Sequence, residues 1–483
     1  MHKRLVFSTI SRMLLIVSLT LFAPLAWAWS SDSSSREVYA FALTIVIGLG
    51  ISFLSRSTLR FKEKEYQKLN AKDGLAIVGL SWVGLSFVGA LPVYFSGVVS
   101  GFTDAFFEVV SGFTTTGATV IPNIEVLPRG ILFWRSLTHW LGGAGIIVLD
   151  LALLPAFGQT SFRLFKAEFA GVTAERIHLR IKETAKIFLT VYCLLSLAEI
   201  GLLMLGRMSL FDALCHTFGT VSTGGFSTRN VSIGAYGAYV QWVVTVFMFL
   251  AGTNFVLHYY ALRGDVSSYL KSEEFRAYSL LTLIAITIFI VFAFAGGAAH
   301  PVRDTAFQVV SILTTTGFRT TDFDLWPVFL KFGLILFMFI GGCSGSMGGG
   351  LKMARVVLAV KMAKSSLTQA IFPNAVLPVK MDGKPVLSQL TTGILEYFFV
   401  YIVLFFLGGL ILTITDRCDL VTAFSASVAS LSNVGPGLAK VGATHNYAWV
   451  SVPGKWTLIF LMLAGRLEVY SILILMLPAT WRK

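Results

Sequence analysis

Four short stretches rich in hydroxyl-bearing residues and glycine interrupt a chain that is otherwise strongly apolar. Two of them read TTTG and end at Gly117 and Gly317, and the other two end at Gly224 and Gly435. Rings of backbone carbonyl oxygens can replace the hydration shell of a cation. Glycine accepts a positive φ angle, which lets neighbouring carbonyls point the same way without a steric penalty at Cβ. The chemistry indicated is therefore cation coordination by main-chain oxygens.

The residues before each glycine would supply the other oxygens of the same site. The residues directly before the four glycines are all β-branched, which stiffens the backbone that carries the carbonyls; they are Thr116, Thr223, Thr316 and Val434. The full set of candidate coordinating residues is Thr115, Thr116, Gly117, Ser222, Thr223, Gly224, Thr315, Thr316, Gly317, Asn433, Val434 and Gly435. We expect metal binding at the carbonyls of this set alone.

A shared segment precedes every one of these stretches. It begins with an acid suited to a helix N-terminus, namely Asp104, Asp212, Asp304 or Asp419. From a following alanine (Ala105, Ala213, Ala306 or Ala423) the glycine is 12, 11, 11 and 12 residues away. A single stretch of this kind would be an ordinary polar turn at a membrane interface. Four matched copies indicate an internal repeat of about a hundred residues.

The composition places these repeats in a membrane. Hydrophobic residues make up 55% of the 483 residues and charged residues only 13%, too little charge to cover a soluble protein of this length. Ten stretches are long enough to cross roughly 30 Å of hydrocarbon as helices. They are 10–29, 38–55, 74–98, 130–157, 187–206, 237–262, 277–298, 326–362 with an interruption, 397–415 and 456–481.

In each repeat a short semi-polar segment lies between two spans. Loop backbone cannot face lipid, so it must be buried in protein or line a water-filled cavity. We therefore expect an all-α polytopic membrane protein, with four helix, re-entrant loop, helix repeats around one pseudo-fourfold pore and two additional N-terminal helices. The expected divisions are 1–72 for the N-terminal pair and its basic loop, then 73–162, 163–262, 263–363 and 364–483 for the four repeats.

The distribution of positive charge predicts the orientation. With ten alternating spans, 26 lysines and arginines fall on the side of the termini and ten on the other side, which makes both termini cytoplasmic. A basic inner face beside anionic lipid explains the net charge of +13 without nucleic acid. The segment 1–31 also resembles a secretory signal with an A-x-A-like AWA motif, but we expect a retained helix.

A second unusual stretch lies inside the eighth span. Six glycines occur among the ten residues 341–350, and each destabilises a helix by about 1 kcal/mol relative to alanine. We expect the helix to open into a loop at 341–351, as in broken spans that line transport sites. A close helix crossing between small residues is the alternative. Lys352 follows directly and is suited to anchor the loop.

Ionisable and polar residues inside the spans are the remaining candidates. Arg466 lies about ten residues into the last span and either projects into the pore as a cationic barrier or pairs with an acid on another helix. Asp150 and Asn254, at similar depth in the first two repeats, are expected to line the vestibule on the cytoplasmic side. Arg135 and His139 are expected to fasten the second helix of the first repeat to its glycine loop.

These motifs resemble the Trk/Ktr potassium transporters, specifically their TrkH-type membrane subunits. The matching stretches are GFTTTGAT, STGGFST at Ser222–Thr228, TTTGFRTTDF at Thr314–Phe323 and SNVGPGL at Ser432–Leu438, together with the two extra N-terminal spans. The resemblance implies potassium-selective loops and a gate below them. The gate would comprise Gly345, Ser346, Gly348, Gly349, Gly350 and Lys352, with Arg466 as a barrier.

The resemblance also implies partners that composition does not reveal. These are a second copy of the chain in a homodimer and a cytosolic TrkA-type ring, which would carry the only nucleotide (NAD or ATP/ADP). This chain would hold potassium ions and no cofactor, in a bacterial inner membrane. It carries no phosphate-binding G-x-x-x-x-G-K-[ST] motif, so the membrane potential, at about 2.3 kcal/mol per charge per 100 mV, would drive uptake.

Two alternatives remain at this stage. Proton- or sodium-coupled symport would need a buried acid such as Asp150 or Glu199. A polytopic membrane enzyme would need convergent catalytic groups, but the sequence has no H-E-x-x-H motif and no nucleophile with an evident base. We therefore expect a transport protein, with the ratio of potassium to sodium selectivity open.

Overall fold

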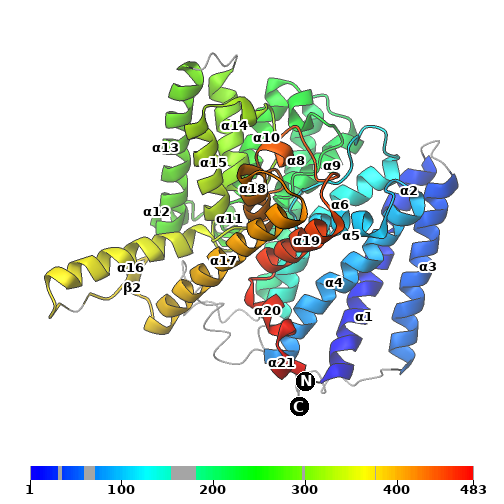
Figure 1. Cartoon of the computed structure of the whole chain (residues 1–483), viewed down its shortest axis with the longest axis horizontal. Helices are drawn as coiled ribbons and strands as arrows, with labels where there is room; N and C mark the ends of the chain where they lie inside the picture. Colours follow the sequence, from blue (N-terminus) through cyan, green and yellow to red (C-terminus); the bar gives the residue numbers. More distant parts are fainter. Residues whose placement is uncertain are drawn as a thin grey trace.

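The computed structural model describes residues 2–30, 35–58, 71–153, 181–295, 300–375 and 377–481. Its α-helices are α1 (Lys3–Thr20), α2 (Phe22–Ser30), α3 (Ser35–Thr58), α4 (Ala71–Ser96), α5 (Phe102–Phe113), α6 (Arg129–Leu153), α8 (Ile181–Leu205), α9 (Leu210–Val221), α10 (Ala238–Ala251), α11 (Phe255–Leu262), α12 (Ser267–Lys271), α13 (Glu273–Ala295), α14 (Pro301–Leu313), α15 (Val328–Ile340), α16 (Met353–Ile371), α17 (Ser388–Thr415), α18 (Leu420–Leu431), α19 (Val452–Arg466), α20 (Tyr470–Met476) and α21 (Pro478–Trp481) (Figure 1). Short 3-10 helices are η3 (Ser232–Ala235), η4 (Phe323–Leu325) and η5 (Ala439–Val441), and β1 (Lys380–Met381) pairs with β2 (Lys384–Pro385) in an antiparallel hairpin.

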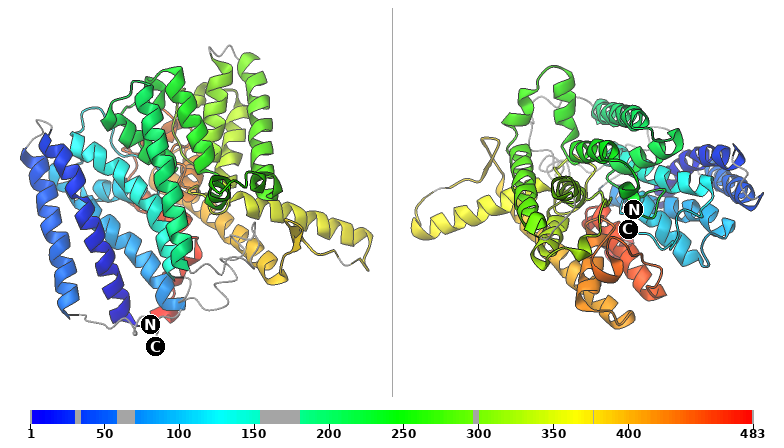
Figure 2. Two further views of the ribbon diagram at one scale, coloured as in Figure 1. Left: turned by 180° about the vertical axis from the view of Figure 1, so that it is seen from behind. Right: turned by 90° about the horizontal axis from the view of Figure 1, so that it is seen from above.

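After α3, the helices form four consecutive groups of a long first helix, a short helix and a second helix. The short helices, α5, α9, α14 and α18, precede the glycine loops and are called pore helices below. The second helix of each group packs against the next pore helix: α6 against α9, α10 against α14, α15 against α18 and α19 against α5. The four groups therefore form a closed cycle around one centre, visible from above in Figure 2, as the repeat predicts.

The acids at the start of the pore helices occupy the expected positions. The side chain of Asp419 caps α18 by accepting the N–H of Thr422 at 3.0 Å. Asp104, Asp212 and Asp304 lie in the first turns of their helices. Carboxylates at these ends compensate the unpaired N–H groups and the positive end of the helix dipole.

The N-terminal helices form a separate pair beside the first repeat. α1 and α3 lie side by side, and both pack on α4 (Figure 1). Ser11 donates its hydroxyl to the carbonyl of Ser52 at 3.2 Å, and Ser52 donates to the carbonyl of Ser11 at 3.1 Å. The beginning of α1 and the end of α21 lie at the same end of the molecule, as ten spans require.

Not every predicted span is a straight helix. Within the described residues, six helices are long and apolar enough to cross a membrane, and α10 with α11 makes a seventh. The other three predicted spans correspond to α6, to α15 with α16, and to α19 with α20 and α21. The prediction was wrong in expecting only the eighth span to break: α10 and α11 meet at 102°, and α19 ends at Arg466.

Local chemistry explains the two unexpected breaks. Asn254 caps α11 by accepting the N–H of Val256 at 2.9 Å, so a new helix begins there instead of the old one continuing. In the last repeat, Glu468 and Val469 have φ angles of 57° and 39°, which no continuous α-helix contains. Both breaks lie close to the glycine loops.

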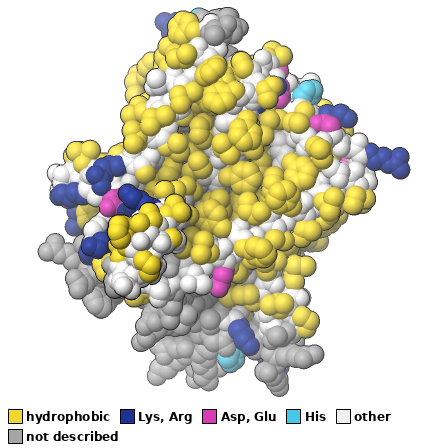
Figure 3. All heavy atoms as spheres, turned by 60° about the vertical axis from the view of Figure 1, so that its left-hand side comes forward, with side chains coloured by type: hydrophobic (Ala, Val, Ile, Leu, Met, Phe, Trp, Pro, Cys, Tyr) yellow, Lys and Arg dark blue, Asp and Glu magenta, His cyan; other side chains and the backbone are white. Residues whose placement is uncertain are grey.

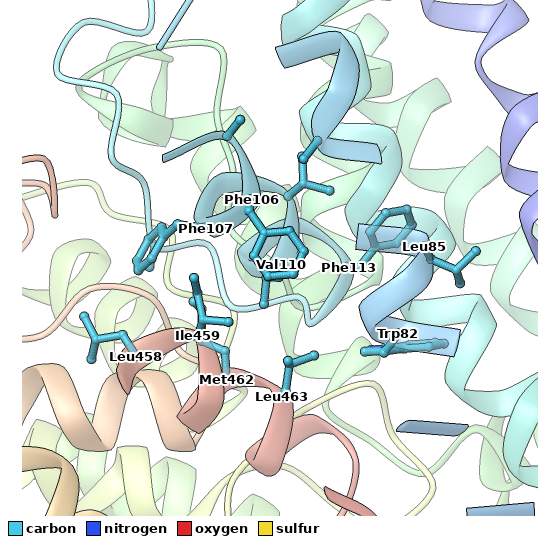
Figure 4. Packing of buried hydrophobic residues seen from close by; sticks show 14 of the residues in the cluster. Trp82, Leu85, Phe106, Phe107, Val110, Phe113, Leu458, Ile459, Met462 and Leu463 are labelled. Carbon is cyan, nitrogen blue, oxygen red and sulfur yellow. The ribbon is translucent and has the colours of Figure 1, made fainter. Parts of the chain in front are cut away.

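The pore helices occupy the core of the protein. Phe106, Phe107, Val110 and Phe113 of α5 contact α4, through Trp82 and Leu85, and α19, through Leu458, Ile459, Met462 and Leu463 (Figure 4). All these side chains are less than a tenth exposed. A pore helix too short to cross a membrane is thus held by apolar contacts with neighbouring repeats.

The surface is apolar where the long helices face outward. Figure 3 shows a face with an extensive hydrophobic surface and few charges. Exposed side chains on α13, among them Leu280, Leu283, Ile284 and Val291, contribute to the apolar surface of the protein. Lipid is the environment that matches such a surface, and the finding confirms a multi-pass membrane protein. α16 extends away from the bundle with the β1–β2 hairpin beside it (Figure 1).

Candidate ion-conduction site

The four glycine loops share one backbone conformation. Each follows a pore helix and contains a residue with positive φ: Thr115 (52°), Thr223 (56°), Thr315 (61°) and Asn433 (56°). The next residue donates its N–H to the carbonyl five residues earlier. These bonds run from Thr116 to Ser111 (2.9 Å), Gly224 to Gly219 (2.7 Å), Thr316 to Ser311 (2.8 Å) and Val434 to Ala429 (2.8 Å). The loops therefore correspond residue by residue.

This correspondence corrects the predicted alignment of two repeats. The glycines with positive φ are Gly117 (82°), Gly225 (82°), Gly317 (77°) and Gly435 (97°). Gly224 is instead the counterpart of Thr116, so this position is not β-branched in every repeat. Likewise Thr305, not Ala306, is the counterpart of Ala105, and the glycine then lies 12 residues later in all four repeats. Two adjacent glycines concealed the true register in the second repeat.

The four loops, residues 114–117, 222–225, 314–317 and 432–435, close into a structure that we call the glycine ring. A Cβ atom added to Gly117 would overlap the carbonyl oxygen of Gly224 in the next loop. The same relation joins Gly225 to Thr316, Gly317 to Val434, and Gly435 to Thr116. Each glycine is therefore required twice, by its positive φ and by the neighbouring carbonyl. The ring brings together one carbonyl oxygen from each repeat.

The surroundings of the glycine ring favour a cation. All four pore helices end at the ring, and a helix C-terminus carries a partial negative charge of roughly half an electron. On one side, the four glycines with positive φ line a cavity of about 120 Å³, which we call the mouth. The arrangement combines loops of mostly buried residues, the C-terminal ends of four helices and a cavity on one side.

Buried polar groups fasten the first loop. Arg135 Nε donates to a carboxylate oxygen of Glu108 at 2.7 Å, and both side chains are buried. Glu108 also accepts the N–H of Val120 at 2.9 Å and the hydroxyl of Thr119 at 2.9 Å. The Arg135 guanidinium carbon lies 4.1 Å from the ring centre of Phe226 in the second repeat. The ion pair thus holds two adjacent loops in place.

His139 makes a second connection between the same repeats. Its Nδ1 donates to the Gly112 carbonyl at 2.7 Å, and its Nε2 accepts the N–H of Phe226 at 3.2 Å. The imidazole also occupies the space that a side chain at Gly224 would need. These contacts confirm that Arg135 and His139 fasten the second helix of the first repeat to the loops.

The glycine-rich stretch of the eighth span forms a loop, as predicted, and contacts the glycine ring. Gly349 donates its N–H to the Thr315 hydroxyl at 2.7 Å, and a Cβ at Gly349 would overlap the carbonyl oxygen of Ser432. Gly341, Gly345 and Gly350 have φ angles of 76°, 71° and 75°, so the loop needs glycine at these positions. The loop therefore packs against loops three and four.

Two basic side chains hold this loop by its carbonyls. Lys352 Nζ donates to the Gly348 carbonyl at 2.8 Å and to the Ser346 carbonyl at 3.3 Å. Arg466, buried at the end of α19, donates Nη1 to the Met347 carbonyl at 2.7 Å and Nη2 to the Gly142 carbonyl at 3.4 Å. Arg466 thus joins the loop to α19 and α6.

Glu274 is an important residue that the sequence reasoning missed. It lies near the start of α13, buried, and one carboxylate oxygen accepts the N–H groups of Ser344 at 2.5 Å and Ala354 at 3.0 Å. Ser344 lies within the glycine-rich loop and Ala354 in the first turn of α16, which follows it. The available signal was the acidic pair Glu273–Glu274 directly before an apolar span.

The remaining candidates have different surroundings. Asn254 caps α11 and lies beside the glycine-rich loop, because the adjacent Phe255 donates its N–H to the Gly345 carbonyl at 3.1 Å. Glu199 is buried in α8, with Thr220 of the pore helix α9 as its polar neighbour. The side chain of Asp150 lies outside the described residues, although its backbone belongs to α6.

Comparisons with known proteins agree with this geometry. Residues 42–482 match the family model described as "TrkH: Cation transport protein". The chain is 39% identical over 425 residues to the Trk system potassium uptake protein TrkH of Vibrio parahaemolyticus, covering 86% of this chain and 87% of the relative. It is 34% identical over 423 residues to TrkG of Escherichia coli, covering 86% of each chain.

A solved structure extends the match to the whole fold. The crystal structure of the potassium transporter TrkH from Vibrio parahaemolyticus superimposes with a TM-score of 0.90 at 34% sequence identity, covering 100% of both chains. The match therefore extends over the whole of this chain, from its two N-terminal spans through its four repeats. The comparisons also decide against the membrane-enzyme alternative, because the family and the relatives are described as transport proteins and not as enzymes. The chain belongs to the TrkH family of cation transport proteins.

Proposed function

We propose that the protein takes up potassium across the bacterial inner membrane by gated conduction through the glycine ring. The observation that carries the proposal is the closed ring itself, in which each of four repeats contributes a carbonyl next to the glycine of the preceding repeat. Rings of carbonyls replace the hydration shell of potassium in channel filters. The names of the relatives, all potassium uptake proteins, supply the ion.

In this proposal the ligands of potassium are main-chain oxygens of the glycine ring. In the corrected set, Gly225 replaces Gly224 as the positive-φ glycine of the second repeat. Gly224 remains in the set because its carbonyl oxygen belongs to the ring. The predicted residues Thr115, Thr116, Ser222, Thr223, Thr315, Thr316, Asn433 and Val434 supply the backbone around them. Four pore-helix ends stabilise the ion, and none of the ring residues just named has an ionisable side chain.

We propose that the glycine-rich loop is the gate. It presses against loops three and four, while Lys352, Arg466 and Glu274 hold it from three elements. Opening would require the loop to leave the Gly349–Thr315 contact, and the six glycines give it the backbone freedom to do so. The guanidinium of Arg466 adds a positive charge beside the path, which supports its role as a barrier.

The wider assembly follows from the family resemblance. We propose that both termini are cytoplasmic, that the mouth faces outward, and that two copies of the chain form a homodimer. A TrkA-type ring would bind the basic cytoplasmic side and carry the nucleotide, so this chain holds potassium and no cofactor. The predicted repeat boundaries, 73–162, 163–262, 263–363 and 364–483, enclose one pore helix each.

Coupled symport is the second candidate, and Glu199 is the observation that favours it. This carboxyl is buried within a membrane span next to a pore helix, a position from which a proton could be exchanged. Asp150, the other acid considered, has no described side chain.

A reversal-potential measurement in proteoliposomes separates the two. Opposed potassium and sodium gradients are imposed first, and a proton gradient is then added. Conduction predicts a potential that follows potassium alone in both conditions, in wild type and in Glu199→Gln. A potential that moves with the proton or sodium gradient, and stops doing so in Glu199→Gln, would contradict conduction and establish symport.

A further inference from the structure

The position two residues after the ring glycine differs between repeats. It holds Thr119 in the first repeat and Ser227 in the second, and each bonds to a side chain of its own pore helix. The Thr119 hydroxyl lies 2.9 Å from Glu108, and the Ser227 hydroxyl lies 2.9 Å from Nε2 of His216. Small hydroxyl residues at this position therefore fasten the strand that follows the ring.

In the third repeat the same position holds Arg319, which makes no such bond. The pore-helix residue that corresponds to Glu108 is Gln308, and neither polar atom of its side chain has a partner among the described residues. The fourth repeat has Gly437, with no side chain at all. A long cationic side chain is thus present at one of four equivalent positions, without the fastening role.

Arg319 is held so that its charge lies in the mouth. Its Nη2 donates to the carbonyl of Asn230, and its own carbonyl accepts the N–H of Gly234 at 3.1 Å. Its Nη1 has no protein partner among the described residues. Arg319 and Asn230 line the same cavity as the four glycines of positive φ.

The charges around the mouth are unbalanced. Arg135, Arg229 and Arg319 line it, whereas the described lining includes no aspartate or glutamate. Arg135 is neutralised by its buried ion pair with Glu108.

The other two arginines have different acids near them. Arg229 is exposed and interacts with Asp212 and Glu125. The acid that acts on Arg319 is Asp322, whose carboxylate already accepts the N–H of Asp324 at 3.0 Å and the hydroxyl of Thr444 at 3.3 Å.

We propose that Arg319 is a specificity-determining residue that lowers the concentration of cations in the mouth and excludes divalent cations from the glycine ring. This inference rests on the proposed function, because it needs an ion path through the ring. Electrostatic repulsion scales with the charge of the ion, so a divalent cation is repelled twice as strongly as potassium. The ring selects among monovalent ions by its carbonyls, and Arg319 selects by charge.

The test measures potassium flux into proteoliposomes for wild type, Arg319→Gln, Arg319→Lys and Arg303→Gln. Arg303 lies in the same repeat at the start of α14, beside Asp304, and does not line the mouth. Flux through each of the four proteins is measured at one fixed potassium concentration, with and without external Mg²⁺. An impermeant salt sets the total ionic strength to about 10 mM or to about 1 M. At 1 M salt the screening length falls to roughly 3 Å, which removes the effect of a fixed charge.

We expect Arg319→Gln to raise potassium flux about threefold at low ionic strength, because the local concentration of potassium in the mouth rises by that factor. The local concentration of a divalent ion rises by the square of the same factor, so inhibition by Mg²⁺ should strengthen roughly ninefold. Arg319→Lys and Arg303→Gln should behave as wild type, and all should converge at 1 M salt. Wild type alone should conduct faster as salt rises, which tests the inference even if Arg319→Gln does not fold.

Three results would overturn the inference. One is wild-type flux that falls with ionic strength, and another is an Arg319→Gln change that persists at 1 M salt. The third is the same change in Arg319→Lys, which would indicate a steric role. A wild type that passes no potassium under any condition would instead overturn the proposed conduction, and with it the need for a charge at the mouth.

Discussion

The glycine loops and the second helices that follow them belong to the same repeats, but only the loops keep the fourfold symmetry. All four loops have the same sequence of φ signs and the same i to i−5 hydrogen bond. The second helices differ: α6 is continuous in the described residues, α10 bends by 102° into α11, α15 opens into the glycine-rich loop, and α19 ends at Arg466.

This contrast suggests different roles for the two regions: ion coordination for the loops and gating for the second helices. If the ring coordinates an ion, as proposed, equivalent oxygens are needed from all four repeats, so the loops could not diverge without losing coordination. A gate needs only one element that can move and others that can hold it. In the proposed function the third repeat supplies this loop, which Lys352, Glu274 and Arg466 contact. The experiments below perturb one side of this comparison at a time.

The largest effect is expected for Gly225→Ala within the ring. The new Cβ would overlap the Thr316 carbonyl, and alanine at a φ of 82° costs about 1–2 kcal/mol in backbone strain. Potassium flux should fall at least about tenfold, with loss of selectivity over sodium. Gly201→Ala, in α8 with open space where the new Cβ would lie, is the matched control. Normal selectivity in Gly225→Ala would mean that the ring is not the filter.

The next largest effect is expected for the buried ion pair behind the first loop. Glu108→Ala leaves Arg135 buried without its carboxylate, which costs about 3–5 kcal/mol. Gln308→Ala, the same position in the third repeat, removes an amide with no described partner and should cost about 1 kcal/mol or less. Thermal unfolding in detergent compares them. Equal losses would show that the loops are supported equally and that the asymmetry has no energetic consequence.

A moderate effect is expected at the gate. Lys352→Met removes the bonds to the Gly348 and Ser346 carbonyls, and a bond of this charged type contributes about 1.5–3 kcal/mol. The closed state should lose roughly a tenfold to hundredfold advantage, so that flux rises in vesicles lacking cytosolic partners. Lys361→Met, which removes an ion pair between α16 and Glu273 of α13, should leave flux unchanged. Unchanged or lower flux in Lys352→Met would argue against the gate.

The smallest effect is expected for Asn433→Gly. Glycine keeps the positive φ, but the amide bonds to the Thr116 hydroxyl and the Met462 carbonyl, both 2.9 Å, are lost. We expect about 1–2 kcal/mol less stability and a measurably weaker preference for potassium in reversal potentials. Thr315→Gly, which loses the contact to Gly349 instead, should affect gating more than selectivity. The reverse pattern would assign the loops the opposite roles.

Much of this architecture could be predicted from the sequence because the relevant signals are local. Each of three features can be recognised from consecutive residues alone: the ten apolar stretches, the four acid-to-glycine segments and the cluster of six glycines. The register of the second loop could not be predicted, because Gly224 and Gly225 are adjacent and it is the positive φ of 82° at Gly225 that distinguishes them.

Other features depended on contacts between distant residues. Nothing near Glu274 in sequence shows that its carboxylate meets Ser344 and Ala354, about seventy and eighty residues away. The break at Asn254 was also missed, since an asparagine inside an apolar stretch is read as a polar residue in a helix until its capping bond is seen. Local chemistry predicts elements, and tertiary contacts decide where they end.

The central claim is that the ion binds at the glycine ring, and the most direct test is to locate it. Crystals grown in Tl⁺, a potassium substitute with strong anomalous scattering, would show where the ion lies. We predict anomalous density on the axis, among the carbonyl oxygens of Thr116, Gly224, Thr316 and Val434. Density beside a carboxylate such as Glu199, with none at the ring, would contradict the account.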